Sequence, residues 1–287
     1  MNYKTNYHTH SEFCDGHATA EQMVKEAVKK NFNILGFSSH SMYPFGGTWH
    51  IAPKEHEAYA QEIRRLEKKY KNKLSILLGF EADFIPSLCE PTFKRFKEFE
   101  PDFLIGSVHY IVNEKGFVTV DESAQGVKTG IEKLFNGNGK KFVQEYFALE
   151  REMLRTCDFT ILGHADLIRI RNGALNFFSE EDSWYKNEVK ALVKEIKKRD
   201  VIVEINTGAI ARKNMNDVYP SAFFLDQLNK AGLRITINSD AHAIENLDAA
   251  FDIARQKAIA AGFTESAVIL PPKSSGQKAD IIMQPLV

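Results

Sequence analysis

Short apolar runs rich in strand-forming residues alternate with amphipathic stretches along almost the whole chain. Within the amphipathic stretches, apolar residues recur with the spacing of one helix face, as at Ala20, Met23, Val24, Ala27 and Val28. Because alternating strands and helices imply parallel strands joined by right-handed crossovers, we expect a doubly wound sheet or a closed barrel. The seven predicted strands cover residues 4–9, 34–38, 75–80, 103–108, 159–162, 201–205 and 234–237.

The chain contains no linker rich in serine and glycine, so residues 1–270 are predicted to form one domain. About seven strand–helix units at this spacing are typical of a slightly small α/β barrel. The longest departure, residues 111–139, follows the fourth predicted strand, where a long insertion is expected to be a functional loop. Residues 271–287 are predicted to form an extended or loosely packed C-terminal tail, to which we assign no role.

Charge and cysteine content exclude several functional classes. In 287 residues, 37 basic side chains almost cancel 38 acidic ones, which argues against a protein whose main task is binding nucleic acid or an anionic membrane. The N-terminus has no apolar leader and no run of 18 apolar residues occurs, so the expected location is the cytoplasm. Cys14, Cys89 and Cys157 form no C-x-x-C pair, which argues against disulfides and thiolate zinc sites.

Residues of types that commonly bind metals follow six of the seven predicted strands. Because side chains alternate along a strand, each X-x-X pair presents both groups on one face if the strand continues that far. The carboxyl ends of parallel strands meet at one mouth of a barrel, where barrel enzymes keep their chemistry. The pairs are His8 and His10, Glu81 and Asp83, His164 and Asp166, and Asp240 and His242, with single residues at His40 and His109 and with Asp15 and His17 in the first loop.

A single histidine at a strand end is usually structural, but seven of the nine histidines share this one location. Scattered core histidines have no reason to follow strand register, so the pattern favours a metal cluster. No ligand role is assigned to His56, in a charged helix, or to His50, in a loop with Gly46, Gly47 and Trp49 that could at most form a lid. The predicted ligands are His8, His10, His17, His40, Glu81, His109, His164, Asp240 and His242.

Nine candidates exceed the three or four protein ligands of one catalytic metal, which predicts two or three divalent ions. Imidazole and carboxylate without thiolate suit Zn, Mn, Fe or Co. Glu81 is the most plausible bridge, and a hydroxide between ions about 3.5–4 Å apart would be a nucleophile at neutral pH. Phosphoester hydrolysis is the leading hypothesis, and amide hydrolysis by a binuclear amidohydrolase is the second.

The motifs occur in a familiar order: H-x-H, D-G-H, a lone H, E-x-D, H, G-H-x-D and S-D-x-H, from His8 to His242. This ordered set resembles the PHP (polymerase and histidinol phosphatase) family. The resemblance implies a distorted (β/α)7 barrel, similar to a TIM barrel, with a trinuclear site. It also implies three ligand sets: His8, His10, Glu81 and Asp240; Glu81, His109 and His164; and His17, His40 and His242.

Within that family, the start N-Y-H-T-H-S-E-F-C-D-G-H and the run G-H-A-D-L-I-R look like histidinol-phosphate phosphatases. The resemblance implies hydrolysis of L-histidinol phosphate to L-histidinol and phosphate, in histidine biosynthesis. A small phosphate ester is therefore the expected partner, without nucleic acid, membrane or an obligate protein partner. The alternative is another phosphomonoester or a nucleotide phosphodiester.

Further polar residues near the strand ends are candidates for substrate binding and proton transfer. Arg169, Arg171 and Arg212 could bind phosphate oxygens bidentately at the rim. Asp15 and Asp166 could orient a ligand histidine or protonate the leaving group, and we favour Asp15 for direct involvement. With Glu81 and Asp240, Asp15 completes the predicted catalytic set, whereas Asp83 is interpreted as structural.

Three other functions remain as competing hypotheses. A phosphodiesterase or exonuclease predicts an extended basic groove or a nucleic-acid module, and the sequence shows neither. A non-catalytic metal-binding domain predicts missing ligand positions, whereas all nine are present. An amidohydrolase would be favoured by a lysine after a strand, but Glu81 or His109 stands there.

Overall fold

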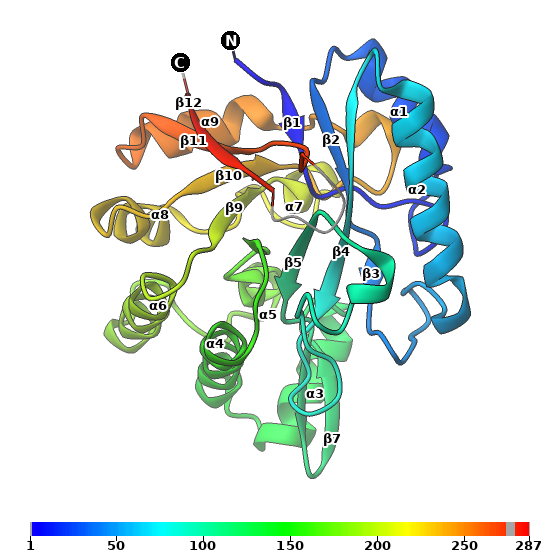
Figure 1. Cartoon of the computed structure of the whole chain (residues 1–287). Helices are drawn as coiled ribbons and strands as arrows, with labels where there is room; N and C mark the ends of the chain where they lie inside the picture. The colour runs from blue at the N-terminus through cyan, green and yellow to red at the C-terminus, as the bar shows by residue number, and fades with distance from the viewer. Residues whose placement is uncertain (1, 274–278, 287) are drawn as a thin grey trace.

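Seven parallel strands curve into a nearly closed barrel in the computed structural model, which describes residues 2–273 and 279–286 (Figure 1). The seam between the first and last strands is closed by Thr9 and Ala241, because the Ala241 amide donates to the His8 carbonyl at 3.1 Å. The order of neighbouring strands is β1 (Thr5–Asn6), β2 (Ile34–Phe37), β4 (Ser75–Asp83), β5 (Phe103–Ser107), β8 (Ile161–Leu162), β9 (Ile202–Asn206) and β10 (Ile235–Asn238), with β3 (His40–Ser41) paired to β4.

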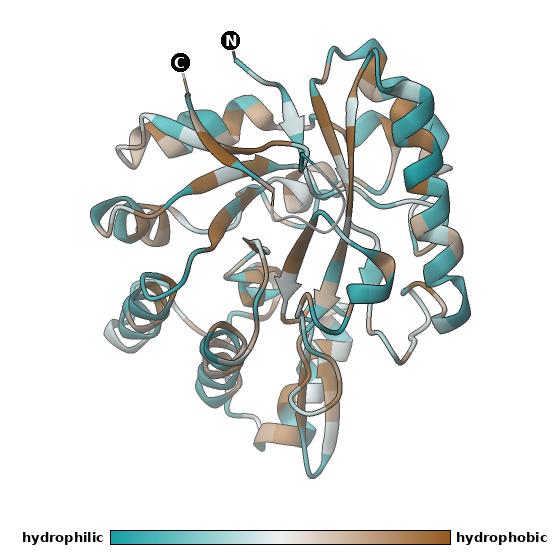
Figure 2. Cartoon of the chain, viewed as in Figure 1, coloured by the Kyte–Doolittle hydropathy of each residue, from teal (hydrophilic) through white to brown (hydrophobic). Residues whose placement is uncertain are grey.

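Helices surround this barrel and turn their apolar faces toward it, so hydrophilic residues dominate the outer ring of ribbons (Figure 2). The first helix begins with a capping box, in which Thr19 and Gln22 each accept a hydrogen bond from the other's backbone amide. The longer outer helices are α1 (Ala20–Lys29), α2 (His56–Tyr70), α4 (Gly139–Thr156), α6 (Ser183–Ile196), α8 (Ala222–Lys230) and α9 (Phe251–Ala260). Shorter turns are α5 (Asn172–Leu175), α7 (Gly208–Ala211), η1 (Pro53–Glu55), η2 (Lys97–Phe99), η3 (Leu167–Arg169) and η4 (Ile244–Asn246).

The amino-terminal end of the barrel is filled by apolar side chains. Tyr7, Leu77, Phe103 and Ile161 belong to a buried cluster that also includes residues of β11 (Glu265–Ile269). The Tyr7 hydroxyl donates to the Ile269 carbonyl at 3.0 Å and accepts from the Ile269 amide at 2.8 Å. This packing leaves the carboxyl ends of the strands as the end that carries polar residues.

The C-terminal residues contribute a strand to the fold. β12 (Ile281–Pro285) pairs antiparallel with β11, and Gln284 exchanges hydrogen bonds with the backbone of Tyr3. The two described ends of the chain therefore lie side by side (Figure 1). Within the predicted extended or loosely packed tail, residues 281–285 thus form an extended strand that pairs with β11, whereas 274–278 lie outside the described residues.

The insertion at 111–139 begins as a β-hairpin and continues as a helix. β6 (Tyr110–Asn113) pairs with β7 (Gly116–Thr119), and α3 (Ala124–Phe135) packs against the hairpin. The predicted single-domain α/β barrel of seven strands is confirmed. Among the described helices, none is both long and apolar enough to cross a membrane.

Candidate metal centre

Eight of the nine predicted ligands converge at the carboxyl-terminal mouth of the barrel. They form four overlapping groups whose nitrogen and oxygen atoms lie within 4.8 Å of one another. Asp15 joins them, and His17 does not. The groups are His10, Asp15, His40 and His242; His8, His164 and Asp240; His8, His10 and Glu81; and His40, Glu81 and His109.

Glu81 occupies the middle of the cluster. It extends from β4, and the parallel register places His40 of β3 directly beside it. Its Oε2 lies 2.7 Å from His40 Nδ1 and 3.0 Å from His8 Nε2, and its Oε1 lies 2.8 Å from His164 Nε2. The side chain is completely buried, so its carboxylate faces the imidazoles and not bulk water.

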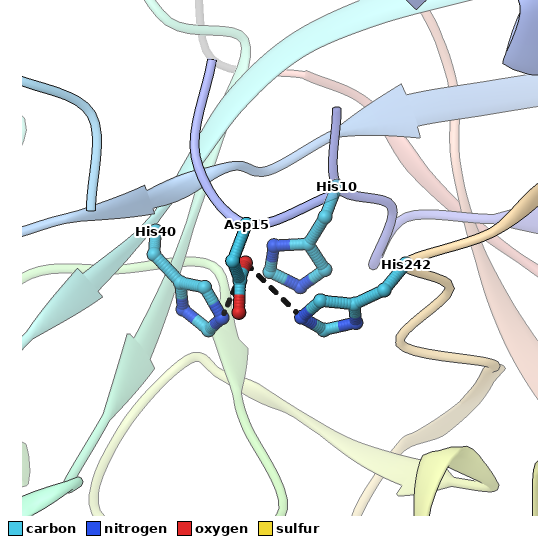
Figure 3. Close-up of side chains that lie close together, drawn as sticks. All are labelled: His10, Asp15, His40 and His242. Carbon is cyan, nitrogen blue, oxygen red and sulfur yellow. Dashed lines mark ion pairs between the residues drawn. The ribbon is translucent and has the colours of Figure 1, made fainter. Parts of the chain in front are cut away.

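A second part of the cluster lies around Asp15 (Figure 3). Asp15 Oδ1 is 3.3 Å from His242 Nε2 and 3.7 Å from His40 Nε2, and the ring of His10 stacks on that of His242 with centroids 4.0 Å apart. The exposed side chain of His17 stands outside the four groups, although its backbone amide donates to the His242 carbonyl at 2.7 Å.

The turn that separates Asp15 from His17 is unusually tight. The Gly16 amide donates to the Ser11 carbonyl at 3.2 Å, and a Cβ at Gly16 would lie 2.6 Å from the Ser11 nitrogen. Only glycine permits this approach, since real Cβ contacts are not that short. On the two sides of this turn, the Asp15 side chain lies in the cluster and the His17 side chain lies in solvent.

Asp240 connects the cluster to the guanidinium of Arg212 at the rim. Its backbone has φ +51°, a left-handed conformation that is uncommon outside glycine. Its Oδ1 lies 3.0 Å from His10 Nε2, and its Oδ2 accepts from Arg212 at 2.9 Å. Despite burial, which opposes the charge, Arg212 and His8 hold the pKa of Asp240 well below its usual value.

Two buried carboxylates contact candidate ligand histidines. Glu204 of β9 contacts His8 Nδ1 at 2.9 Å and accepts from the His164 amide at 2.8 Å. Asp83 contacts His109 Nδ1 at 2.5 Å and His50 Nε2 at 2.6 Å. Such pairing fixes the ring orientation of a metal-binding histidine. The sequence signal for Glu204 is a charged residue inside an apolar strand, whereas His50 lies in an irregular loop and carries no comparable signal.

The donor set fits divalent transition metals. His8 Nε2 and His40 Nδ1 lie within 3.0 Å of Glu81 Oε2, but none of these three buried atoms forms a hydrogen bond among the described residues. Buried polar atoms without partners are costly, and a bound cation would satisfy them. Burial disfavours charge on His8, yet Glu204, Glu81 and Asp240 raise its pKa well above the usual value. This cluster therefore attracts positive charge, which a divalent ion would supply in place of protons.

The three predicted phosphate-binding arginines lie in different surroundings. Arg169 is buried, and its guanidinium donates to Glu180, Asp217 and the Val218 carbonyl at 2.7–2.9 Å. Arg171 donates to the backbone carbonyls of residues 121 and 122, at the insertion. Arg212 alone of the three contacts the cluster.

Asp166 turns away from its predicted partner His164. β8 ends at Leu162, so the alternation of side chains does not extend to residue 166. The Asp166 carboxylate instead accepts from the Ser221 amide at 2.8 Å and lies 3.7 Å from Arg169. Burial raises the pKa of Asp166 to about 6, although Arg169 opposes that shift.

Comparison with known proteins supports the resemblance seen in the ordered motifs. A probable histidinol-phosphatase of Schizosaccharomyces pombe is 25% identical over 284 residues, covering 91% of this chain and 88% of the relative. The histidinol-phosphatase of Bacillus subtilis is 22% identical over 267 residues, covering 87% of this chain and 97% of the relative.

Solved structures show the same fold. The histidinol phosphate phosphatase of Lactococcus lactis, determined with zinc, L-histidinol and phosphate, aligns with a TM-score of 0.70 at 22% identity. The alignment covers 96% of this chain and 98% of that one. The PHP domain itself matches residues 6–208, well over half of the sequence. The chain therefore belongs to the PHP domain family.

Proposed function

We propose that the protein is a metal-dependent phosphomonoesterase that hydrolyses L-histidinol phosphate to L-histidinol and phosphate. The observation that carries this proposal is the convergence of eight predicted ligands and Asp15 in one cluster, with the buried carboxylate of Glu81 in its middle. Membership of the PHP family and several relatives named histidinol-phosphatase support the reaction and its substrate. In this proposal the enzyme acts in histidine biosynthesis.

The cluster would hold two or three divalent ions such as Zn, Mn, Fe or Co. Glu81 would be shared between ions, with His8, His10 and Asp240 on one side and His109 and His164 on the other. His40 and His242 would complete the third set, and we assign Asp15 to it in place of His17, because Asp15 lies in that group. When bound, such ions act as Lewis acids and lower the pKa of water.

Residues of the chain would position the substrate and the ligands. Arg212 extends beside Asp240 with its side chain 31% exposed, so it is placed to contact a phosphate oxygen at the rim. Glu204 and Asp83 hold His8 and His109 in fixed orientations. Burial of Glu81 excludes bulk water from the centre and strengthens electrostatic contacts there.

Phosphate release from L-histidinol phosphate, p-nitrophenyl phosphate and a nucleotide diester tests the proposal. The protein would be reconstituted with Zn, Mn or Co, beside a metal-free control. We expect metal-dependent kcat/KM that is orders of magnitude higher on histidinol phosphate. Weak and equal activity on all three substrates would refute the assigned substrate, and equal activity without metal would refute the metal requirement.

A further inference from the structure

A group of aromatic rings lies against the metal cluster and takes no part in the functions assigned above. Trp49 stacks on His50, with ring centroids 3.7 Å apart and planes 30° apart. Tyr110 at the start of β6 is parallel to Trp49, with centroids 5.8 Å apart and planes within 10°. Trp49 is also perpendicular to the candidate ligands His40 and His109, at 4.5 and 5.2 Å.

These distances show which part of the indole is covered. His50 occupies one face of Trp49. The ring centroids of His40 and His50 are 6.0 Å apart, close to the separation expected if the two rings lie in perpendicular directions from the indole centre. His40 therefore lies at the edge of the indole and not over its face. Tyr110 is almost equally distant from both rings, so it lies beside the stack. Both Trp49 and Tyr110 remain partly exposed at the mouth of the barrel.

The stack is anchored to the cluster by a buried chain of contacts. His50 is 5% exposed and contacts Asp83, which in turn contacts His109. The position of the indole is therefore tied to a candidate metal ligand through two short contacts. A flat ring placed against the exposed part of the indole would lie beside the candidate ligands His40 and His109, where the proposed function places the phosphate.

We propose that Trp49 and Tyr110 form the wall that binds the planar ring of the substrate's leaving group. This inference rests on the proposed function for the position of the phosphate. Stacking between aromatic rings favours a flat heteroaromatic group over an aliphatic one. Tryptophan also gives the strongest attraction to a cation over its face, which favours an imidazole that is protonated part of the time. The wall selects phosphomonoesters of alcohols that carry an imidazole or similar ring.

Tryptophan fluorescence tests ring binding without turnover, because the chain has only two tryptophans. Trp184 lies near the start of α6, where its ring contacts Phe178 and Tyr185. The variant W184F therefore keeps Trp49, beside the cluster, as the only indole of the chain. We expect L-histidinol to quench W184F saturably, with no effect of L-alaninol, which lacks the ring. W49F, which keeps only Trp184, should not respond. Absence of quenching in W184F would overturn the proposal.

Substrate discrimination gives an independent test. In the metal-loaded enzyme, W49L should lower the ratio of kcat/KM for histidinol phosphate to that for glycerol 2-phosphate by about tenfold, the size expected for one aromatic stack. W49F should restore part of the ratio, and W184L is the matched control that should leave it unchanged. Equal losses on both substrates, at unchanged metal content, would overturn the proposal. Quenching by histidinol in a protein that hydrolyses neither ester would support the wall while refuting the proposed function.

Discussion

Arg169 provides a sharp test, because its sequence position and its surroundings suggest different roles. As a phosphate-binding residue it would raise KM when removed, yet the structure buries its guanidinium among Glu180, Asp217 and the Val218 carbonyl. The substitution Arg169→Met keeps the length of the side chain and removes the charge. We expect it to reduce stability and to leave KM within about threefold of the wild type.

The expected loss follows from how each partner can compensate. Asp217 is 26% exposed and keeps Lys257 at 2.7 Å, and Glu180 is 37% exposed, so both can return to water. Asp166 is completely buried and retains only the Ser221 amide as a hydrogen-bond donor among the described residues. Removing one partner of a buried ion pair costs about 3–5 kcal/mol, and we expect the lower end of that range.

Urea unfolding followed by circular dichroism measures this loss. With a slope of about 3 kcal/mol per M for a chain of this size, a loss of about 3 kcal/mol lowers the midpoint by about 1 M. Arg171→Met is the matched control, because its bonds are at the surface and should contribute about 1 kcal/mol or less. An unchanged midpoint together with a large rise in KM would refute the structural role and restore phosphate binding to Arg169.

Three further predictions concern other charges. Glu81→Gln should lower metal content and reduce kcat/KM by more than the roughly 10–100-fold typical of residues that only orient a ligand, and full activity with full metal would refute the bridge. Arg212→Met should lower kcat/KM for the phosphate ester by about tenfold or more, with a midpoint shift below that of Arg169→Met, and an unchanged kcat/KM would exclude a phosphate contact. Burial raises the pKa of Glu150 well above its usual value, so the folded state retains a proton that the unfolded state releases, and stability falls as pH rises above about 4.5. Glu150→Gln removes that loss, so its urea midpoint should rise relative to the wild type from pH 5 to pH 8, whereas the exposed control Glu145→Gln should show no such trend.

The barrel was predictable because the sequence pattern that specifies each strand is local and recurs along the chain. Each predicted strand overlaps an observed one, since a short apolar run bounded by polar residues has few other ways to be buried. The lengths were less predictable: β1 is confined to Thr5–Asn6, whereas β4 extends to Asp83. Those bounds depend on which neighbours supply hydrogen bonds, and that information is not local.

The sequence allowed most residues of the cluster to be predicted, but it did not show which side chains point into the cluster. Parallel topology alone brings strand ends together, so eight of the residues that meet in the cluster could be named without coordinates. The choice between Asp15 and His17 depends on the turn that Gly16 makes against the Ser11 backbone. Two residues on either side of one glycine carry equally suitable donors, and only the backbone path decides which one points inward.

In some X-x-X pairs, the alternation of side chains along a strand explains where both residues lie. In others it does not. Glu81 and Asp83 both lie within the continuous strand β4, so alternation places both inside the barrel, where one faces the cluster and the other supports His109. Asp166 and Asp240 lie beyond the ends of β8 and β10, and Asp240 reaches the cluster only through a left-handed backbone conformation. Because that conformation is disfavoured outside glycine, contacts to His10 and Arg212 must hold it in place. The assembly of the candidate cluster therefore depends on loops that depart from strand geometry, and the charged groups within the cluster stabilise those departures.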